Sequence, residues 1–320
     1  MAHLKVRTSG RTLSRFAVAA IAAALVATGA GAASASVPVP VPVRAGGIGP
    51  AHPLPKMPAR TPHIRSLTAT SAADIAADPV FPLLGIDNSG DAWAYGPDGI
   101  GGLTPREAAG SLPSVTNNAF VDNNADGYLD GQWEWANDGT LHYFVDANTP
   151  DKVIGGGWNI YDTELSPGNL GGAQGYDVIA RDSAGVLWLY LGYGDGTVTS
   201  RIRVGGGWEV YTQLAGKCDL DGDGKADIVA RDTAGVLWFY KGTGNYNAPF
   251  APRTRIGAGW NMFNRIVSTG DVDLDGRTDL LARDTNGGLW LYKGSGLAAD
   301  PYETRVQIGS NYNIYRLMTS

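Results

Sequence analysis

The sequence contains very little sulfur and very little histidine. Its single cysteine, Cys218, excludes an intramolecular disulfide, and it leaves no cysteine pair with the spacing of a zinc site. Four histidines occur in 320 residues, and His142 is the only one that lies beyond residue 63. With so few histidines, no catalytic set of serine, histidine and acid can be proposed. The sequence therefore predicts no catalytic residue and does not indicate an enzyme.

Charge and helical periodicity are also scarce. Only 18% of the residues are charged, and the formal net charge is -6. Nucleic acid and anionic membrane surfaces are poor partners for a chain with this charge balance. Stretches rich in Leu and Ala with a helical period are confined to residues 1–35, so a helical bundle is excluded. By contrast, 45 glycines, nine tryptophans and fourteen tyrosines indicate a turn-rich fold with a substantial core.

The first eighty residues read as two processing and spacer segments. Residues 1–35 combine basic residues, the apolar run 16–33 and a terminal Ala-Ser-Ala, which is typical of a signal peptide. A retained membrane anchor is the alternative, but the run is short beside the roughly 20 residues of a spanning helix. The prolines of 36–80 predict an extended linker. We expect a secreted protein that does not insert into the membrane after processing, with its folded part at 81–320.

This remainder repeats itself with a period close to fifty residues. Three strong copies occupy 177–194, 227–244 and 279–296, and two weaker copies occupy 83–99 and 130–146. A second phrase begins at positions 154, 204, 256 and 308, so its spacings are 50, 52 and 52. Five modules are visible, and their anchor residues are Trp93, His142, Trp188, Trp238 and Trp290.

Each module predicts four short strands. In the fourth module these are 209–216, 227–232, 235–241 and 252–257. Near-continuous apolar runs such as Val-Leu-Trp-Phe-Tyr indicate sheets that are covered on both faces, which disfavours a sandwich with wet outer faces. The fold class is therefore expected to be all-β, a five-bladed β-propeller of four-stranded blades. Residues 313–320 copy the strand that begins each module, so we expect them to complete the first blade and close the ring.

The repeated phrases also resemble a known family. GDxDxDGxxDLLARDxxGxLWLYKGxG and IGxGWNxY are similar to the FG-GAP-like (VCBS) repeats of secreted bacterial proteins, which are related to the integrin α-subunit propeller. The resemblance covers roughly 81–320. The five-fold count and the Trp-rich blades are also similar to the tachylectin-2-like sugar-binding propellers. Integrin propellers have seven blades, so an integrin-type ligand surface is not implied. The resemblance implies a secreted, non-catalytic binding module, with extracellular carbohydrate or a surface protein as its partner.

Three loops carry the pattern D-x-[DN]-x-D-G-x-x-D at module spacing. In a tight loop the side chains at positions 1, 3 and 5 point inward, the glycine makes the turn, and the carbonyl of position 7 and the ninth residue complete an oxygen cage suited to Ca²⁺. The candidate calcium ligands are Asp122, Asn124, Asp126, Tyr128 and Asp130, then Asp219, Asp221, Asp223, Lys225 and Asp227, then Asp271, Asp273, Asp275, Arg277 and Asp279.

These loops are not EF-hands, because they lack the glutamate at position 12 and the flanking helices. They resemble the calcium-binding β-hairpin loops of the integrin-type repeat. The alternative is a solvated Asp-Gly turn without an ion, but three copies at module spacing favour calcium. Residues 169–177 keep only Asp177, and the segment before the first blade keeps only Asp74 and Asp78, so no metal is expected there. We expect calcium to stabilise blade junctions and to have no catalytic role.

Several aromatic and charged residues recur with the modules. Trp158, Trp208 and Trp260 follow glycine-rich turns and are tentative carbohydrate-binding residues, since a sugar ring stacks on a half-exposed aromatic ring. An inter-blade wedge is the alternative for them. The anchor tryptophans are expected to pack between blades. The arginines of the Arg-Asp pairs that begin at positions 181, 231 and 283 are expected to reach a neighbouring carboxylate or carbonyl group.

Two further functions stay open. A propeller hydrolase or lyase acting on polysaccharide would carry a carboxylate pair with shifted pKa values, or a metal with an open position, in a central or inter-blade pocket. A protein-adhesion module would show an exposed apolar patch on one rim.

Overall fold

The computed structural model describes residues 79–146, 149–172 and 175–320. The expected signal peptide and the linker as far as residue 78 lie outside the described residues. The described part is built from strands and four short 3-10 turns, and it contains no α-helix. Accordingly, no helix in this part could cross a membrane.

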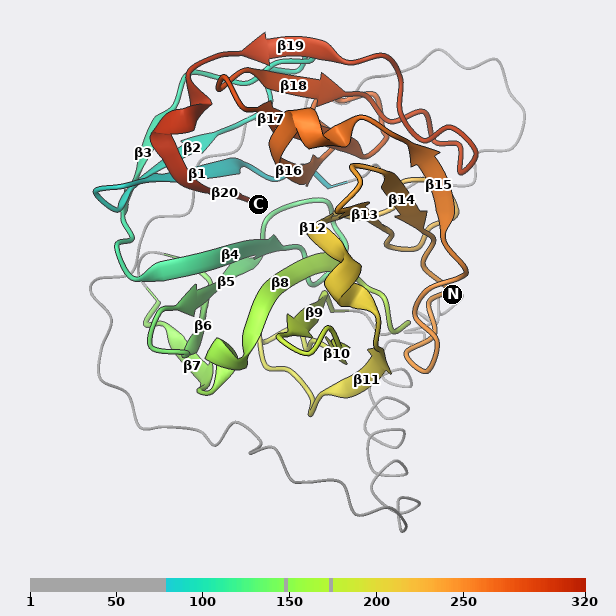
Figure 1. Cartoon of the computed structure of the whole chain (residues 1–320). Helices are drawn as coiled ribbons and strands as arrows, with labels where there is room; N and C mark the ends of the chain where they lie inside the picture. Colours follow the sequence, from blue (N-terminus) through green and yellow to red (C-terminus); the bar gives the residue numbers. More distant parts are fainter. Residues whose placement is uncertain (1–78, 147–148, 173–174) are drawn as a thin grey trace, which may run out of the picture. The chain divides into compact units, whose positions relative to one another are not determined.

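Twenty strands form five antiparallel sheets, which are arranged as blades around a common axis (Figure 1). Each sheet has four strands, and the innermost strands of successive blades contact one another. From the innermost strand outward, the blades are blade 1, β20 (Tyr315–Thr319), β1 (Leu83–Asp87), β2 (Asp91–Tyr95) and β3 (Glu107–Ser111); blade 2, β4 (Val115–Val121), β5 (Gly131–Ala136), β6 (Leu141–Phe144) and β7 (Lys152–Gly155); blade 3, β8 (Tyr161–Gly168), β9 (Asp177–Asp182), β10 (Leu187–Tyr190) and β11 (Ile202–Gly205); blade 4, β12 (Tyr211–Ala215), β13 (Ile228–Asp232), β14 (Leu237–Tyr240) and β15 (Thr254–Gly257); and blade 5, β16 (Phe263–Gly270), β17 (Asp279–Asp284), β18 (Leu289–Tyr292) and β19 (Val306–Gly309). The all-β, five-bladed propeller predicted from the sequence is confirmed.

The ring is closed by the last strand of the chain. β20 pairs with β1, with Leu84 opposite Thr319 and Ile86 opposite Leu317. Gly85 of β1 lies beneath the ring of Tyr315, and a Cβ atom there would be 2.8 Å from that ring. The two ends of the propeller sequence therefore share one sheet, as the copied strand at 313–320 predicts.

Adjacent blades are packed together by buried apolar faces. Along β10, Leu187 and Leu189 are fully buried against residues of blade 4, including Trp208 and Ile228. Trp188 and Tyr190, which alternate with these leucines, point to the opposite face and join the core shared with blade 2. Because both faces of a blade contact a neighbour, the strands lack the polar alternation of a half-exposed sheet.

Three arginines add polar connections between blades. Arg181 of β9 donates to the carbonyl oxygens of Trp208 and Tyr211 at the start of blade 4. Arg231 and Arg283 make the corresponding bonds to the first residues of blade 5 and of β20. The expectation that these arginines reach a neighbouring carbonyl group is confirmed. The last of these connections adds to the closure of the ring, because β20 belongs to blade 1.

Candidate calcium loops and blade-edge sites

The three acidic loops each join the innermost strand of a blade to its second strand. The Asp122 loop (122–130) follows β4, the Asp219 loop (219–227) follows β12, and the Asp271 loop (271–279) follows β16. The expected position at a junction between two blades is therefore wrong. The repeated phrase begins at the second strand of a sheet, so the preceding loop looks like a boundary although it lies within one blade.

The first aspartate of each loop folds the backbone around itself. In the Asp219 loop, the Asp219 carboxylate accepts hydrogen bonds from the amides of Asp221, Gly222 and Gly224. In the Asp271 loop, Oδ1 of Asp271 accepts from Asp275 N at 3.0 Å, and Oδ2 accepts from Gly276 N at 2.8 Å. Backbone donors of this kind hold a carboxylate in place before any cation binds.

The ninth aspartate connects the loop to the rest of its sheet. Asp227 accepts from Leu220 N within the loop at 3.0 Å and from Gly242 N beyond β14 at 2.6 Å. Asp279 makes the same two bonds in blade 5. Asp177 repeats them in blade 3, where the other acidic positions are missing. This structural role explains why Asp177 is present in a module that lacks the rest of the pattern.

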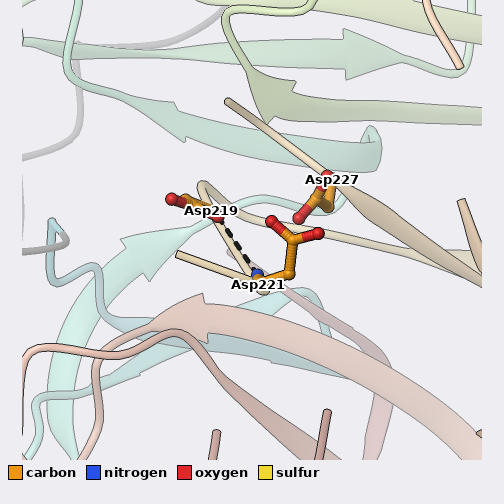
Figure 2. A group of neighbouring side chains, drawn as sticks. All are labelled: Asp219, Asp221 and Asp227. Atoms are coloured by element: carbon orange, nitrogen blue, oxygen red, sulfur yellow. Dashed lines mark hydrogen bonds between the residues drawn. The ribbon is translucent and has the colours of Figure 1, made fainter. Parts of the chain in front are cut away.

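Carboxylate oxygens converge in two of the loops. Figure 2 shows Asp219, Asp221 and Asp227 facing one another, with the Asp219 carboxylate bonded to the amide of Asp221. One oxygen from each of these residues lies within 4.8 Å of the other two. Oδ1 of Asp221 is buried without a hydrogen-bond partner, and its side chain is only 2% exposed. A buried anionic oxygen without a donor is the arrangement that a cation would complete.

The Asp271 loop brings together a slightly different set. Oxygens of Asp271, Asp273 and Asp275 lie within 4.8 Å of one another. Asp279 instead acts through its bonds to backbone amides. Burial raises the pKa of Asp271 to about 6 and that of Asp279 to about 8, and the neighbouring aspartates add to both shifts. A bound cation would relieve this cost of ionisation.

The Asp122 loop is less well assembled. Oxygens of Asp122, Asp126 and Asp130 do not form a set within the distance met by the other two loops. Asn124 uses its amide internally, donating to Asp130 at 3.1 Å and accepting from Asp126 N at 2.9 Å. Tyr128 is exposed at the loop surface. Of the three loops expected to bind calcium, this one is thus the least prepared for it.

Two lysines outside the predicted ligand sets lie against the two converged loops. Lys241 contacts Asp221 at 2.5 Å and Asp223 at 3.0 Å, and Lys293 contacts Asp273 at 2.7 Å. Although burial opposes it, the bonds from Lys241 and Lys225 lower the pKa of Asp223. The corresponding residues of blades 2 and 3 are Val145 and Leu191. Lysine occurs at this position only beside a converged acidic loop. This pattern in the sequence could have distinguished the two converged loops from the others.

The donor set of the Asp219 and Asp271 loops suits calcium. All the candidate groups are carboxylate or carbonyl oxygens, which hard divalent cations prefer, and no histidine or thiol takes part. The side chains of Lys225 and Arg277 point to Asp223 and Asp275, so only their main-chain carbonyls are suited to bind a cation.

The three tryptophans expected to bind sugar are buried. Each lies in a short 3-10 turn before an innermost strand, η1 (Trp158–Ile160), η2 (Trp208–Val210) or η3 (Trp260–Met262). The preceding glycines have left-handed backbone angles, and Gly157 has φ 85°. This turn packs Trp158 against Tyr190, with ring centroids 4.7 Å apart. The expected half-exposed position is wrong, and the inter-blade wedge is what the structure shows.

The anchor tryptophans are the ones that reach the surface. Trp93, Trp188, Trp238 and Trp290 are partly exposed, and each has an arginine guanidinium over its ring. The distances to the ring centroid are 4.1 Å for Arg106, Arg201 and Arg253, and 4.7 Å for Arg305. In three of the blades the indole N–H donates to an aspartate at the hairpin turn, as in the 2.8 Å bond from Trp188 to Asp182. We call these four arrangements the Trp–Arg stacks.

Blade 2 replaces the stack by a hydrogen-bonded array. His142 occupies the tryptophan position, and Asp151 occupies the arginine position. Nδ1 of His142 is 2.7 Å from Asp151, and Nε2 is 2.9 Å from the hydroxyl of Thr140. The Thr140 hydroxyl also donates to Asp138 at 2.6 Å. The array could not be recognised in the sequence, because Asp151 comes beside His142 only when β6 and β7 pair.

Comparison with known proteins agrees with the repeat analysis. Residues 219–282, which include two acidic loops, match the FG-GAP-like repeat. The chain carries an FG-GAP-like repeat. No curated protein matches the chain.

The solved structures that resemble this propeller do so distantly. The BP39L lectin from Burkholderia pseudomallei is 13% identical, with a TM-score of 0.46 over 72% of this chain and 70% of that chain. An arginine-to-alanine triple mutant of AofleA from Arthrobotrys oligospora is 8% identical, with a TM-score of 0.42 over 72% of each chain. Regucalcin from Agrobacterium tumefaciens, a calcium-binding protein, is 12% identical, with a TM-score of 0.38 over 72% and 75%. At these scores the likenesses carry no argument about ligands.

Proposed function

We propose that this chain is an exported, calcium-stabilised and non-catalytic binding module whose ligand is extracellular carbohydrate. The observation that carries the ligand class is the four-fold repetition of the Trp–Arg stacks at the blade edges. Each stack combines a partly exposed aromatic ring with a guanidinium that has N–H groups to offer. Because the guanidinium covers one face of the ring, a pyranose would pack its apolar face on the outer side of the stack, and its hydroxyls would accept hydrogen bonds from the guanidinium N–H groups.

The converged acidic loops support the calcium part of the proposal. Calcium that binds the folded loops and not the unfolded chain stabilises the propeller by mass action. Export is supported by the signal-peptide pattern of residues 1–35. The stacks themselves contain no metal ligand, so calcium would act on glycan binding through the stability of the fold.

Glycan-array binding with wild-type protein and stack variants tests the ligand class. Replacing the stacked arginines Arg201 and Arg253 together by glutamine should weaken glycan binding at least about 10-fold, because multivalent contacts are lost. The matched control replaces Arg203 and Arg255, which are exposed on the neighbouring strands β11 and β15 and do not stack on tryptophan. Equal loss in both double variants, or no glycan binding by the folded calcium-loaded protein, contradicts the proposal.

The array in blade 2 is the one observation that points to a rival function, that of a hydrolase. A hydroxyl close to an imidazole that contacts a carboxylate is the arrangement used to activate a nucleophile. Here, however, the side chain of His142 is only 3% exposed, and the Thr140 hydroxyl is shared with Asp138. We expect that neither the wild type nor Thr140→Val turns over polysaccharide or ester substrates. Turnover by the wild type that disappears in this variant would establish the hydrolase instead.

A further inference from the structure

The guanidinium groups of the four Trp–Arg stacks keep most of their hydrogen-bond donors free. Each bonds to a tyrosine hydroxyl of its own blade, in the pairs Arg106 and Tyr315, Arg201 and Tyr161, Arg253 and Tyr211, and Arg305 and Tyr292. Nη1 makes every bond of these groups that lies within the described residues, whereas Nε and Nη2 make none. All four arginines are exposed or half-buried, so a ligand can reach the free donors.

The aspartate beside each stack in blades 3, 4 and 5 is already bonded within its hairpin. Oδ1 of Asp182 accepts from the amide of Val186 at 2.9 Å, and Oδ2 accepts from the indole N–H of Trp188 at 2.8 Å. The corresponding aspartates of blades 4 and 5 make the same two bonds. Although burial opposes it, these bonds and the charge of Arg253 lower the pKa of Asp232.

The hairpin aspartates therefore offset the arginine charge without occupying the arginine donors. In the part of the chain that the structure describes, none of the four stacked arginines forms an ion pair. Each stack thus offers N–H groups to a ligand, while its carboxylate and hydroxyl oxygens are engaged in bonds within the blade.

This donor set distinguishes acidic sugars from neutral ones. A guanidinium can only donate, and every hydroxyl of a neutral sugar carries a proton that it must itself donate. The oxygens of a carboxylate or a sulfate ester only accept. A bond from a guanidinium to an ionised oxygen is roughly twice as strong as a bond between neutral groups. Among sugars that pack on a stack, one with an acidic group therefore makes the best use of the free donors.

The stacked guanidinium is also held in place before a ligand arrives. The groups of Arg201 and Arg253 lie 4.1 Å from the centroids of their tryptophan rings, and the tyrosine bond fixes Nη1. The remaining edge, formed by Nε and Nη2, has the planar fork geometry that matches two oxygens of one acidic group. Because the side chain is already ordered, little conformational entropy is lost on binding.

We propose that the Trp–Arg stacks select acidic saccharides, with the anionic group, a uronic acid carboxylate or a sulfate ester, bound by Nε and Nη2 of the stacked arginine. This inference rests on the function proposed above and names the class of glycan. The chain carries a formal net charge of -6, so its surface as a whole repels a polyanion. A preference for the acidic form of a sugar would therefore report the contact at the stacks.

Calorimetric binding of matched acidic and neutral oligosaccharides to the wild type tests the inference. The first pair is trigalacturonic acid and its methyl ester, and the second is a sulfated galactan oligosaccharide and its desulfated form. Free calcium is held constant with a calcium buffer, because galacturonate also binds calcium. We expect the acidic member of at least one pair to bind about 10-fold more tightly or better, and the pair that responds distinguishes carboxylate from sulfate.

The failure of this inference and that of the proposed function give different results. Neutral members that bind as tightly as the acidic members in both pairs overturn the inference and leave the proposed function standing. If no glycan binds to the folded protein, the proposed function is contradicted and the inference with it. The comparison uses wild-type protein, so it is decisive even if a substitution impairs folding.

Substitution of two stacked arginines tests where the acidic group binds. Arg201→Gln combined with Arg253→Gln should reduce the number of acid-binding sites from about four to about two per chain, because two of the four stacks lose their guanidinium. The same two positions changed to lysine keep the charge but lose the planar fork, so these sites should again be lost. Retention of all sites in the lysine variant would show attraction by charge alone and would contradict the proposed contact.

The matched control changes Arg203 and Arg255 together to glutamine. These arginines pair in register with Trp188 and Trp238 on β11 and β15, and they are exposed without stacking on the rings. The control removes the same two charges and should retain all acid-binding sites and the preference for the acidic form. An equal loss in the control and in the stack variant would show general electrostatic attraction and would contradict the site.

Discussion

Removing Lys241 should have opposite effects on the calcium-free and calcium-bound protein. Its ammonium contacts Asp221 at 2.5 Å and Asp223 at 3.0 Å, and so supplies positive charge to the Asp219 loop in the absence of an ion. A calcium ion in the loop would compete with this ammonium for the negative charge of Asp221, which both contact. Lys241→Gln should therefore destabilise the calcium-free propeller and tighten calcium binding.

The size of both effects follows from the exposure of the pair. The Asp221 side chain is 2% exposed, but that of Lys241 is 38% exposed, so solvent screens a large part of the attraction. After this discount the interaction contributes about 1–2 kcal/mol. We expect the free energy of unfolding without calcium to fall by this amount, and the calcium affinity of the loop to rise about 5–30-fold.

Calorimetric titration in an Asp273→Asn background isolates the Asp219 loop, and urea unfolding in chelator gives the calcium-free stability. Lys152→Gln is the control, because Lys152 pairs with the exposed Asp195 away from the acidic loops. It should change the unfolding free energy by less than about 0.5 kcal/mol and leave calcium affinity unaltered. Unchanged or weaker calcium binding in Lys241→Gln would refute the reasoning.

Three further substitutions test other parts of the structure. Arg231→Met removes the bonds to the carbonyl oxygens of Trp260 and Phe263 and should lower the urea-derived unfolding free energy by about 2–4 kcal/mol; a loss below 1 kcal/mol would show that the bonds do not connect the blades. Gly85→Ala places a Cβ atom 2.8 Å from the Tyr315 ring and should cost about 1–3 kcal/mol, unless β20 moves without penalty. Burial raises the pKa of Glu134 to about 8, so the folded protein keeps this proton up to about pH 8 and the unfolding free energy falls as pH rises from about 4.5 to 8. Glu134→Gln should remove on the order of 2 kcal/mol of that fall. Parallel profiles of unfolding free energy against pH for the wild type and the variant would contradict this.

The fold could be predicted from the sequence because its units repeat. The phrase that forms β13 and β14 recurs in every blade, and residues 313–320 repeat a strand that otherwise lacks its sheet. That copy alone predicted that β20 pairs with β1 and closes the ring. The position of the acidic loops within a blade did not follow, because a repeat shows its period and leaves its starting point arbitrary.

The site residues were predicted less well, because the orientation of side chains and the contacts between residues distant in sequence determine which residues form the site. Glycines before Trp158 suggested an exposed ring, but a left-handed Gly157 turns the ring inward onto Tyr190. The arginine over Trp188 is Arg201, which directly precedes β11 and which no sequence motif marks. A small cavity lined by residues of all five innermost strands could not be predicted from the sequence, because its lining depends on the register of strands far apart in the chain.

Calcium binding by the acidic loops is tested most directly by calorimetric titration of the chelator-treated protein, with site number as the readout. The two converged loops predict at least two calcium ions per chain, one of which is lost in Asp221→Asn and another in Asp273→Asn. Each loss should be accompanied by a smaller calcium-induced rise in Tm. Absence of calcium binding, or full stoichiometry in both variants, would contradict the account.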